Sequence, residues 1–266
     1  MHMCPELGTI GRMNDSPPNG KAAPSSGSGI AGAGRYNFVQ IGTLHSPFKE
    51  KFGIPRQPGL MPSAEARLEI LPPYDRDEAL RGLDAFSHLW LIFVFHGIGR
   101  EEWRPTVRPP RLGGNERIGV FATRSTHRPN PIGLSVVELS GIVRESGRLY
   151  LDLRNVDLMD GTPILDIKPY IAYADVIPEA RCGFAVEAPP VVEVCFSAEA
   201  EQRCIELAQR YPRLRHFIGE MLRLDPRPSY QNTVGRRYGV HVYDLNIVWH
   251  FDGEVLRVDA IEMVQG

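Results

Sequence analysis

Cysteine, lysine and long hydrophobic runs are scarce in this chain of 266 residues. The four cysteines, Cys4, Cys182, Cys195 and Cys204, form no Cys-x-x-Cys pair and have no His partner at zinc-site spacing, so we expect no metal site and no redox dithiol. The longest hydrophobic run, Leu89 to Phe95, is too short to span a bilayer, and the N-terminus has no signal-peptide pattern. We therefore expect a cytoplasmic protein with free thiols.

Several catalytic signatures are also missing. The sequence contains no G-x-S-x-G, no H-E-x-x-H, no P-loop and no pair of carboxylates with an obvious acid and base assignment. Gly27 to Gly32 matches G-x-G-x-x-G, but no strand precedes it and no helix follows it. This context argues against a dinucleotide site.

The composition favours strands and loops. Hydrophobic residues make up 42% of the chain and charged residues 23%, whereas 26 Gly and 23 Pro are too many for a helical bundle. The net charge of −2 argues against an obligate nucleic-acid binder. Two arginine-rich stretches, 100–128 with a local charge of +4 and 203–237 with +5, could nevertheless line a surface for a polyanion. Equally, an arginine-biased composition scatters Arg over the whole surface.

The pattern along the chain predicts a tail and two domains. Residues 1–35 are rich in Ser, Gly, Pro and Ala and are expected to form a disordered, flexible tail. Residues 36–186 are expected to be mostly β, as a closed barrel or a sandwich, because many short strands alternate with turns. The predicted strands are 36–44, 66–71, 88–96, 117–123, 135–144 and 149–156, and the composition of 75–86 is helical, with Gly82 as the stop.

The period of the hydrophobic pattern changes after a proline-containing linker at 185–191. Helical stripes at 204–211 and 214–222, separated by Pro212, predict two short helices. A closing hairpin is expected from strands 240–251 and 255–263 with a turn at Asp252-Gly253. Residues 187–266 should therefore form a small α+β domain that leans on the first domain.

The loop Arg124 to Gly133 is the most constrained in the chain. Pro129 and Pro131 fix their own φ angles and push the preceding residues, Arg128 and Asn130, out of the helical region. Such a loop can present backbone groups to a flat heterocycle at little entropic cost. A plain rigid turn between two strands is the alternative, and the loop alone favours it.

Three further sites could bind a ligand. Asp160-Gly-Thr-Pro163 is a turn whose carboxylate could hold ribose hydroxyls or sit near a cation, and Pro55-Arg-Gln-Pro-Gly59 offers a guanidinium and an amide. A frequent Asp-Gly turn and a solvated loop are the respective alternatives. His96 ends a buried strand, where a lone His is more often a core residue.

Two segments combine Arg with Pro in a form suited to phosphate contact, 104–114 and 225–230, and Tyr230 could stack on a splayed base. Packing between the two domains is the alternative interpretation for both.

In combination, these segments resemble the TrmO family, also called TsaA or YaeB-like. The resemblance runs in order from Tyr36 to the C-terminus, and it rests on the segments 46–52, 55–59, 82–90, 103–114, 119–125, 128–133, 160–163, 166–170 and 225–228. It implies an S-adenosylmethionine-dependent tRNA methyltransferase with a β-barrel domain. The implied product carries a methyl group on N6 of threonylcarbamoyl-adenosine next to the anticodon, chiefly in threonine tRNA.

The resemblance also implies a site. Its S-adenosylmethionine contacts would be Pro55, Arg56, Gln57, His96, Gly97, Arg124, Leu134, Asp160, Gly161, Thr162 and Pro163. The family is dimeric, with the cofactor near the subunit interface. Candidate tRNA contacts are Arg108, Arg111, Lys168, Arg227 and Tyr230.

The sequence identifies no general base, and Asp160 and Tyr230 are conjectures. The rival interpretations are a non-catalytic RNA- or nucleotide-binding module and a methyltransferase with another substrate.

Overall fold

The computed structural model describes residues 34, 36–97, 103–109, 112, 116–227 and 235–264. Strands predominate over helices in this part of the chain, which confirms the expected mostly β class. The predicted tail, residues 1–35, lies outside the described residues apart from Gly34. Within the described residues, no helix is long and apolar enough to cross a membrane.

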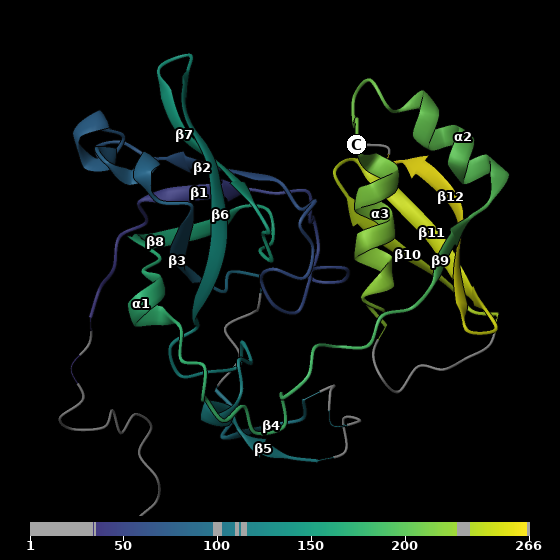
Figure 1. The fold of residues 1–266 in the computed structure, drawn as a ribbon, viewed down its shortest axis with the longest axis horizontal. Helices are drawn as coiled ribbons and strands as arrows, with labels where there is room; N and C mark the ends of the chain where they lie inside the picture. The colour runs from purple at the N-terminus through teal and green to yellow at the C-terminus, as the bar shows by residue number, and fades with distance from the viewer. Residues whose placement is uncertain are drawn as a thin grey trace, which may run out of the picture. The chain divides into compact units, whose positions relative to one another are not determined.

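Six strands form a closed barrel in the order β1-β2-β7-β6-β3-β8 (Figure 1). Every neighbouring pair is antiparallel, and β8 closes the ring by pairing with β1. Successive side chains of a strand point to opposite faces, so in β3 Leu89, Leu91 and Phe93 are buried inside the barrel. The strands are β1 (Gly42–His45), β2 (Ala66–Ile70), β3 (His88–Val94), β6 (Ile132–Glu145), β7 (Arg148–Arg154) and β8 (Thr162–Pro169).

Several predicted elements of this first part differ in the structure. The helix expected at 75–86 is two 3-10 helices, η1 (Asp77–Leu80) and η2 (Leu83–Ala85), separated at Gly82, which has a φ of 83°. The strand expected at 117–123 is β5 (Ile118–Gly119), which pairs with β4 (Thr106–Val107), and a 3-10 turn, η4 (Val120–Ala122). Because β4 has only two residues, it pairs with only two residues of the predicted strand. Strand β8 was not predicted, because Pro163 and Pro169 indicate loop.

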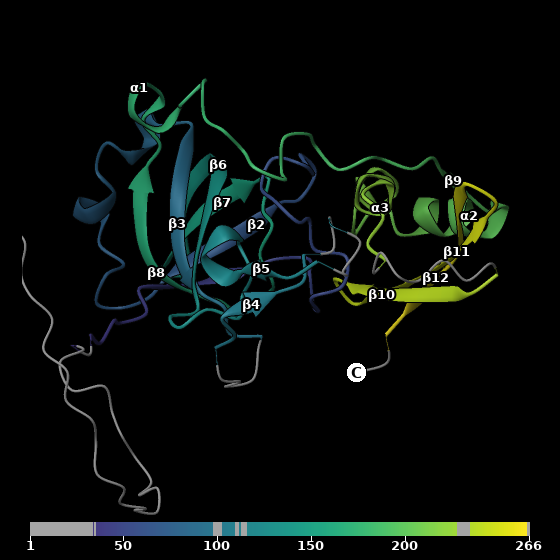
Figure 2. The same ribbon diagram turned by 90° about the horizontal axis from the view of Figure 1, so that it is seen from below.

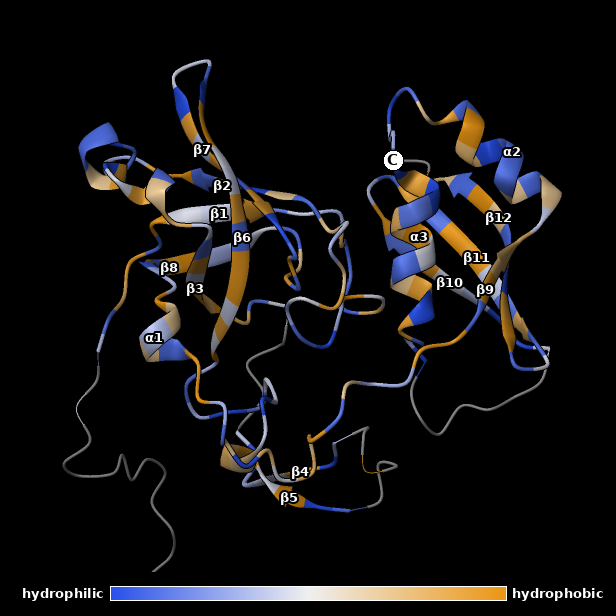
Figure 3. Cartoon of the chain, viewed as in Figure 1, coloured by the Kyte–Doolittle hydropathy of each residue, from blue (hydrophilic) through white to orange (hydrophobic). Residues whose placement is uncertain are grey.

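The C-terminal part is a four-stranded sheet in the order β10-β11-β12-β9, with β9 parallel to β12. Helices α2 and α3 cover one face of this sheet (Figure 2). Bands of hydrophobic and hydrophilic residues alternate along α3 (Figure 3), which buries Leu214, Phe217, Ile218, Met221 and Leu222. The elements are β9 (Val194–Phe196), α2 (Ala198–Glu206), α3 (Leu214–Arg223), β10 (Arg237–Val242), β11 (Leu245–Asp252) and β12 (Val255–Met263), and a short α1 (Ala172–Asp175) precedes them.

The prediction of this part was right for α3 and wrong at two places. The helix expected at 204–211 is α2, which begins earlier, at Ala198, and ends at Glu206, with turns over 207–210. The strand expected at 240–251 is two strands, β10 and β11, joined by a turn in which Tyr243 has a φ of 54°. Neither Tyr243 nor Asp244 is a glycine or proline, so the sequence gives little warning of this turn.

The segment between β1 and β2 packs into the core of the C-terminal sheet. Phe48, Met61 and Ala64 are buried there with Trp249 and the apolar face of α3. The backbone N–H of Tyr243 donates to the carbonyl of Pro47 at 2.7 Å, and Phe48 forms an isolated bridge with Val242. Residues 47–64 therefore precede a barrel strand in sequence and belong to the C-terminal core in space.

Candidate functional site

The predicted cofactor residues gather at one end of the barrel. Strands β1 and β3 end here, and strands β6 and β8 begin here. The N–H of Phe95, just after β3, donates to the carbonyl of Pro131 at 2.8 Å, and the N–H of Gly161, just before β8, donates to the carbonyl of Leu44 at 2.8 Å. The first bond joins the segment of His96 and Gly97 to the one that leads to Leu134, and the pairing of Phe93 with Ile164 places the turn at Asp160 to Pro163 beside them.

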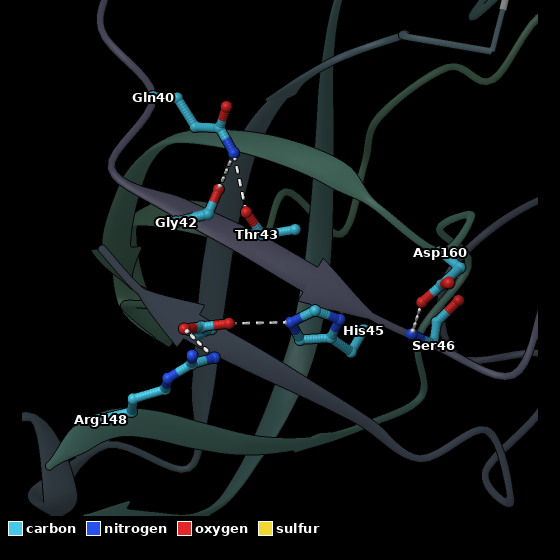
Figure 4. A network of polar contacts seen from close by, with 8 residues as sticks. Gln40, Gly42, Thr43, His45, Ser46, Arg148 and Asp160 are labelled. Carbon is cyan, nitrogen blue, oxygen red and sulfur yellow. Dashed lines mark hydrogen bonds and ion pairs between the residues drawn. The ribbon is translucent and has the colours of Figure 1, made fainter. Parts of the chain in front are cut away.

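Asp160 is held by contacts from two other segments. Its carboxylate accepts the backbone N–H of Ser46 at 2.9 Å (Figure 4) and pairs with the Lys49 ammonium at 2.7 Å. Its backbone carbonyl, which can only accept, takes a hydrogen bond from His96 Nε2–H at 3.2 Å. Each carboxylate oxygen of Asp160 therefore already has a partner, and His96 is tied to the same turn rather than buried in the core.

The turn around Asp160 is tightly built. Gly161 has a φ of 74°, a conformation that favours glycine, and the buried Thr162 hydroxyl donates to the carbonyl of Met159 at 2.6 Å. A Cβ at Gly97 would lie 2.5 Å from the Met159 Cε, so the segment after β3 approaches this turn closely, and a larger residue there would displace the flexible end of Met159. The predicted residues at 96–97 and at 160–163 therefore lie against one another, with the Met159 side chain next to Gly97.

A second junction links the other two predicted segments. The Arg124 guanidinium donates a short hydrogen bond to the side-chain carbonyl of Gln57. Pro55 is buried, whereas Arg56 is exposed and donates to the carbonyl of Arg227 at 3.4 Å. The residues expected from 55–57 and from the 124–133 loop are therefore neighbours.

The loop from Arg124 to Gly133 is braced from within. The Arg128 guanidinium donates to the carbonyls of Thr123 at 3.0 Å and Ser125 at 3.2 Å. A Cβ at Gly133 would lie 2.2 Å from the Phe93 ring, so the strand that follows the loop lies directly against β3 at this point. Leu134, the next residue, points outward and is 54% exposed.

Asp157 is a largely buried carboxylate that the sequence did not reveal. The Ser135 hydroxyl, itself 1% exposed, donates a short hydrogen bond to Asp157 Oδ1. Burial raises the pKa of the Asp157 carboxyl to about 6, and the Ser135 hydrogen bond and the charge of Arg124 only partly oppose this effect. Asp157 is one residue within the apolar stretch 156–159, and no motif marks it.

The candidate tRNA contacts are less close together. Arg108 is exposed, and Lys168 is exposed in an ion pair with Asp166 at 2.8 Å. Arg227 pairs with Asp225 at 2.8 Å and stacks over the Phe251 ring at 3.5 Å, which leaves 15% of its side chain exposed. Arg111 and Tyr230 lie outside the described residues.

An open cleft of about 670 Å³ borders this end of the barrel. Of the predicted cofactor residues, its lining contains Asp160. Lys49, Arg67 and Arg154 are balanced there by the carboxylates of Glu65, Asp152 and Asp160, so the cleft has no strong net charge. His45 of this lining also contacts the Glu69 carboxylate at 3.1 Å, and that carboxylate accepts a hydrogen bond from Arg148 at 3.1 Å (Figure 4). Within the described residues, no group of three His, Cys, Asp or Glu side chains could hold a metal ion.

Two family models match this chain in succession. The model described as the tRNA-methyltransferase O N-terminal domain covers residues 43–176, and the model described as the TrmO C-terminal domain covers residues 189–264. The chain belongs to the tRNA-methyltransferase O family. This membership confirms the resemblance inferred from the motifs, and it spans both parts of the fold.

Individual relatives agree with the family models. A tRNA (adenine(37)-N6)-methyltransferase of Escherichia coli (strain K12) is 50% identical over 230 residues, which are 85% of this chain and 98% of that protein. A Pseudomonas aeruginosa protein named provisionally as an S-adenosylmethionine-dependent methyltransferase is 52% identical over 218 residues, 81% of this chain and 93% of its own length. A crystal structure of TrmO from Pseudomonas aeruginosa superposes with a TM-score of 0.72 at 43% identity, covering 86% of this chain and 98% of that one. Members of the tRNA-methyltransferase O family thus share both the sequence and the fold described above.

Proposed function

We propose that this chain transfers a methyl group from S-adenosylmethionine to N6 of threonylcarbamoyl-adenosine at position 37 of tRNA, next to the anticodon and chiefly in threonine tRNA. One observation carries the proposal: the match to the Escherichia coli enzyme, whose name specifies N6 of adenine 37, covers 98% of that protein. Because tRNA is the substrate, we also propose that the enzyme works in the cytoplasm.

The proposed cofactor site comprises Pro55, Arg56, Gln57, His96, Gly97, Arg124, Leu134, Asp160, Gly161, Thr162 and Pro163. The donor chemistry of these residues fits S-adenosylmethionine. Arg56 and Arg124 can bind the carboxylate of its amino-acid part, and backbone groups of the braced loops can bind its adenine. The Asp160 carboxylate, although neutralised in part by Lys49, suits the neighbourhood of the positive sulfonium and amino groups.

The residues of the site have a limited chemical task. S-adenosylmethionine, when bound, supplies an electrophilic methyl group. The protein must hold N6 in line with that methyl group, exclude water and accept the N6 proton, since N6 of the urea-like substrate is a poor nucleophile. Braced loops such as 124–133 suit the positioning task, because they lose little entropy on binding.

We further propose that the enzyme is a homodimer with the cofactor near the subunit interface. Three large apolar side chains are exposed in the stretch from η4 to the start of β6: Phe121 at 75%, Leu134 at 54% and Ile132 at 37%. A second subunit covering them would bury apolar surface and enclose the site. The tRNA would contact Arg108, Arg111, Lys168, Arg227 and Tyr230, of which Arg108 and Lys168 are exposed.

The substrate assignment can be tested with tRNA from cells that lack this protein. The purified chain and S-adenosylmethionine should add one methyl group to threonylcarbamoyl-adenosine, as measured by mass spectrometry of digested tRNA. Binding of S-adenosylmethionine without methylation of any tRNA would favour the rival binding module. Methylation of another nucleoside, with threonylcarbamoyl-adenosine unchanged, would instead favour a methyltransferase with a different substrate.

A further inference from the structure

The Lys and Arg side chains that line the open cleft beside Asp160 use their hydrogen-bond donors to different extents. All three guanidinium nitrogens of Arg67 donate to carboxylates, at 2.7 to 2.8 Å. The Lys49 ammonium has three donors, and among the described residues its one acceptor is the Asp160 carboxylate at 2.7 Å. The Lys49 side chain is 42% exposed, so its ammonium can also donate to a ligand in the cleft.

The backbone around Lys49 is fixed beside the proposed cofactor site. The preceding residue, Phe48, is fully buried in the core of the C-terminal sheet, and its carbonyl accepts the N–H of Asp160 at 2.8 Å. The N–H of Lys49 itself donates to the carbonyl of His241 at 3.4 Å. Lys49 is therefore joined to Asp160, a proposed cofactor residue, both through the neighbouring backbone and through its own ammonium.

The proposed substrate carries a negative charge close to the reacting atom. Its threonyl group is joined to N6 through a carbamoyl unit and keeps a free carboxylate, whose carbon lies at most about 5 Å from N6 at ordinary bond lengths. Because N6 must come within about 3.5 Å of the methyl carbon to react, a cation that binds this carboxylate must lie directly beside the methyl donor. Lys49 meets this condition through its contact with Asp160. Arg154 does not, because its carboxylate neighbours at 3.6 and 3.9 Å, Glu65 and Glu138, lie outside the proposed cofactor site.

The balance of charge in the cleft also favours a carboxylate ligand once the cofactor is bound. Without ligands, the Asp160 carboxylate neutralises the Lys49 ammonium. The sulfonium and amino groups of S-adenosylmethionine, which we place near Asp160, add positive charge to this pair. A substrate carboxylate on Lys49 would balance that charge, whereas an adenosine without the threonyl group has no charge to offer.

We propose that the cleft beside Asp160 receives the threonyl group of the substrate and that Lys49 binds its carboxylate. Lys49 then selects threonylcarbamoyl-adenosine over unmodified adenosine at position 37. This role rests on the proposed methyltransferase function. A cleft of about 670 Å³ is within the range that holds a drug-sized ligand, so it has room for the threonyl chain. No bond of the threonyl group is made or broken, so Lys49 acts on binding and on the position of N6.

The test uses two anticodon stem-loop RNAs with threonylcarbamoyl-adenosine at position 37. They differ in one group, which is the threonyl carboxylate in the first RNA and the uncharged carboxamide in the second. Fluorescence anisotropy gives the Kd of each RNA in the presence of sinefungin, an unreactive analogue that keeps the positive charges of S-adenosylmethionine. Methylation of each RNA gives kcat/KM, and calorimetry gives the Kd for S-adenosylmethionine.

The full-length wild-type chain is compared with Lys49→Met, Lys49→Arg and a control, Arg203→Met. Met keeps most of the apolar stem of Lys49 and removes its charge, whereas Arg keeps the charge. Arg203 is likewise ion-paired, with Glu206 at 2.9 Å, but it lies in α2 and outside the lining of the cleft.

We expect wild type to bind the carboxylate RNA about 10-fold or more tightly than the carboxamide RNA, as for a hydrogen bond between charged groups. Lys49→Met should lose this preference, because only the carboxylate RNA loses a contact, and its Kd for the carboxamide RNA should stay within about threefold of wild type. The ratio of kcat/KM for the two RNAs should fall in the same way. Lys49→Arg should keep most of the preference, and Arg203→Met should match wild type.

Two results would overturn the assignment. One is a wild-type enzyme that methylates threonylcarbamoyl-adenosine but binds the two RNAs equally, which leaves the proposed function intact. The other is a Lys49→Met variant that weakens both RNAs equally, or weakens only S-adenosylmethionine, which would make Lys49 a structural partner of Asp160. A wild-type chain that binds S-adenosylmethionine but methylates neither RNA would refute the proposed function first, and this role of Lys49 with it.

Discussion

The two arginine-rich stretches of this protein use their charges in different ways. Between residues 203 and 237, most arginines are ion-paired with carboxylates: Arg203 with Glu206, Arg210 with Asp244, Arg213 with Glu65, Arg215 with Glu201, Arg227 with Asp225 and Arg237 with Asp259. Between 100 and 128, the described arginines with known partners bond to neutral groups, namely Arg117 to Thr106, Arg124 to Gln57 and Arg128 to backbone carbonyls. Similar local composition thus yields a network of ion pairs in one stretch, whereas Arg117, Arg124 and Arg128 of the other stretch bond to neutral groups.

This difference shows why local net charge is a poor guide to function. An arginine paired with a carboxylate contributes little field beyond its immediate surroundings, whereas an arginine bonded to a carbonyl keeps its full charge for a ligand. We therefore expect Arg124 in the first stretch to act mainly on ligands, and the ion-paired arginines of the second stretch to act at least as much on stability. The following experiments separate these two roles.

The largest effect is expected at Arg124. Replacement by Ala removes the proposed contact to S-adenosylmethionine and frees Gln57, so the Kd should rise about 30- to 100-fold, as for the loss of a charged hydrogen bond. Calorimetry measures this change, with Arg215→Ala from the paired stretch as the control. A Kd equal to that of wild type would show that Arg124 does not bind the cofactor.

Arg227→Ala should have the opposite profile. The variant loses a partly buried ion pair with Asp225 and the stacking on Phe251, so we expect the free energy of unfolding to fall by about 2 kcal/mol. Denaturant unfolding followed by fluorescence measures this, and the Kd for S-adenosylmethionine should not change. Unaltered stability would contradict this structural role, and a loss of tRNA binding would then leave Arg227 with its proposed tRNA contact alone.

Asp157→Asn should stabilise the protein at neutral pH. The folded-state pKa of about 6 lies above the ordinary value of 3.8, so the buried charge costs stability above pH 6, and this cost disappears as the pH falls below 4. The variant should therefore gain on the order of 2 kcal/mol at pH 7 and nothing at pH 3.5. Unfolding curves at both pH values measure the difference. An equal effect at both would mean that Arg124 already compensates the carboxylate.

The smallest effect is expected at Arg108. Loss of one phosphate contact should weaken tRNA binding only a few-fold, while the slope of log affinity against log salt falls by about one. Filter binding over a series of salt concentrations measures this slope. Arg203→Ala, from the paired stretch, should leave the slope unchanged, and equal slopes for both variants would remove the distinction between the two stretches.

Much of this fold could be predicted from local patterns. Hydrophobic residues alternate along 88–94 and recur at helical spacing along 214–222. Each pattern lies within a single element, and the structure has β3 and α3 there. The loops at 55–57, 96–97, 124–133 and 160–163 could be identified as candidate binding loops from their residue types and from the family resemblance. Their convergence could not be predicted from spacing, because barrel closure through β8 brings them together.

Other features depend on contacts between residues far apart in sequence. Strand β8 contains prolines at 163 and 169 that argue against a strand, and only its pairing with β1 and β3 makes it one. The Ser135–Asp157 contact joins two residues that no motif connects. The turn at Tyr243 breaks a hydrophobic run that looks like a single strand, and the hydrogen bond from its N–H to Pro47 helps hold it in place.

Residues 47–64, which connect two barrel strands, also contribute side chains to the C-terminal core. Pro55 to Gln57 lie between Phe48 and Met61, and both of these anchors are embedded in the C-terminal core. A C-terminal fragment that begins at the linker 185–191 would lack the buried side chains of Phe48 and Met61. We therefore do not expect it to fold on its own. The same segment carries Gln57 to Arg124, so a substitution that disturbs the C-terminal core should also displace a residue of the proposed cofactor site.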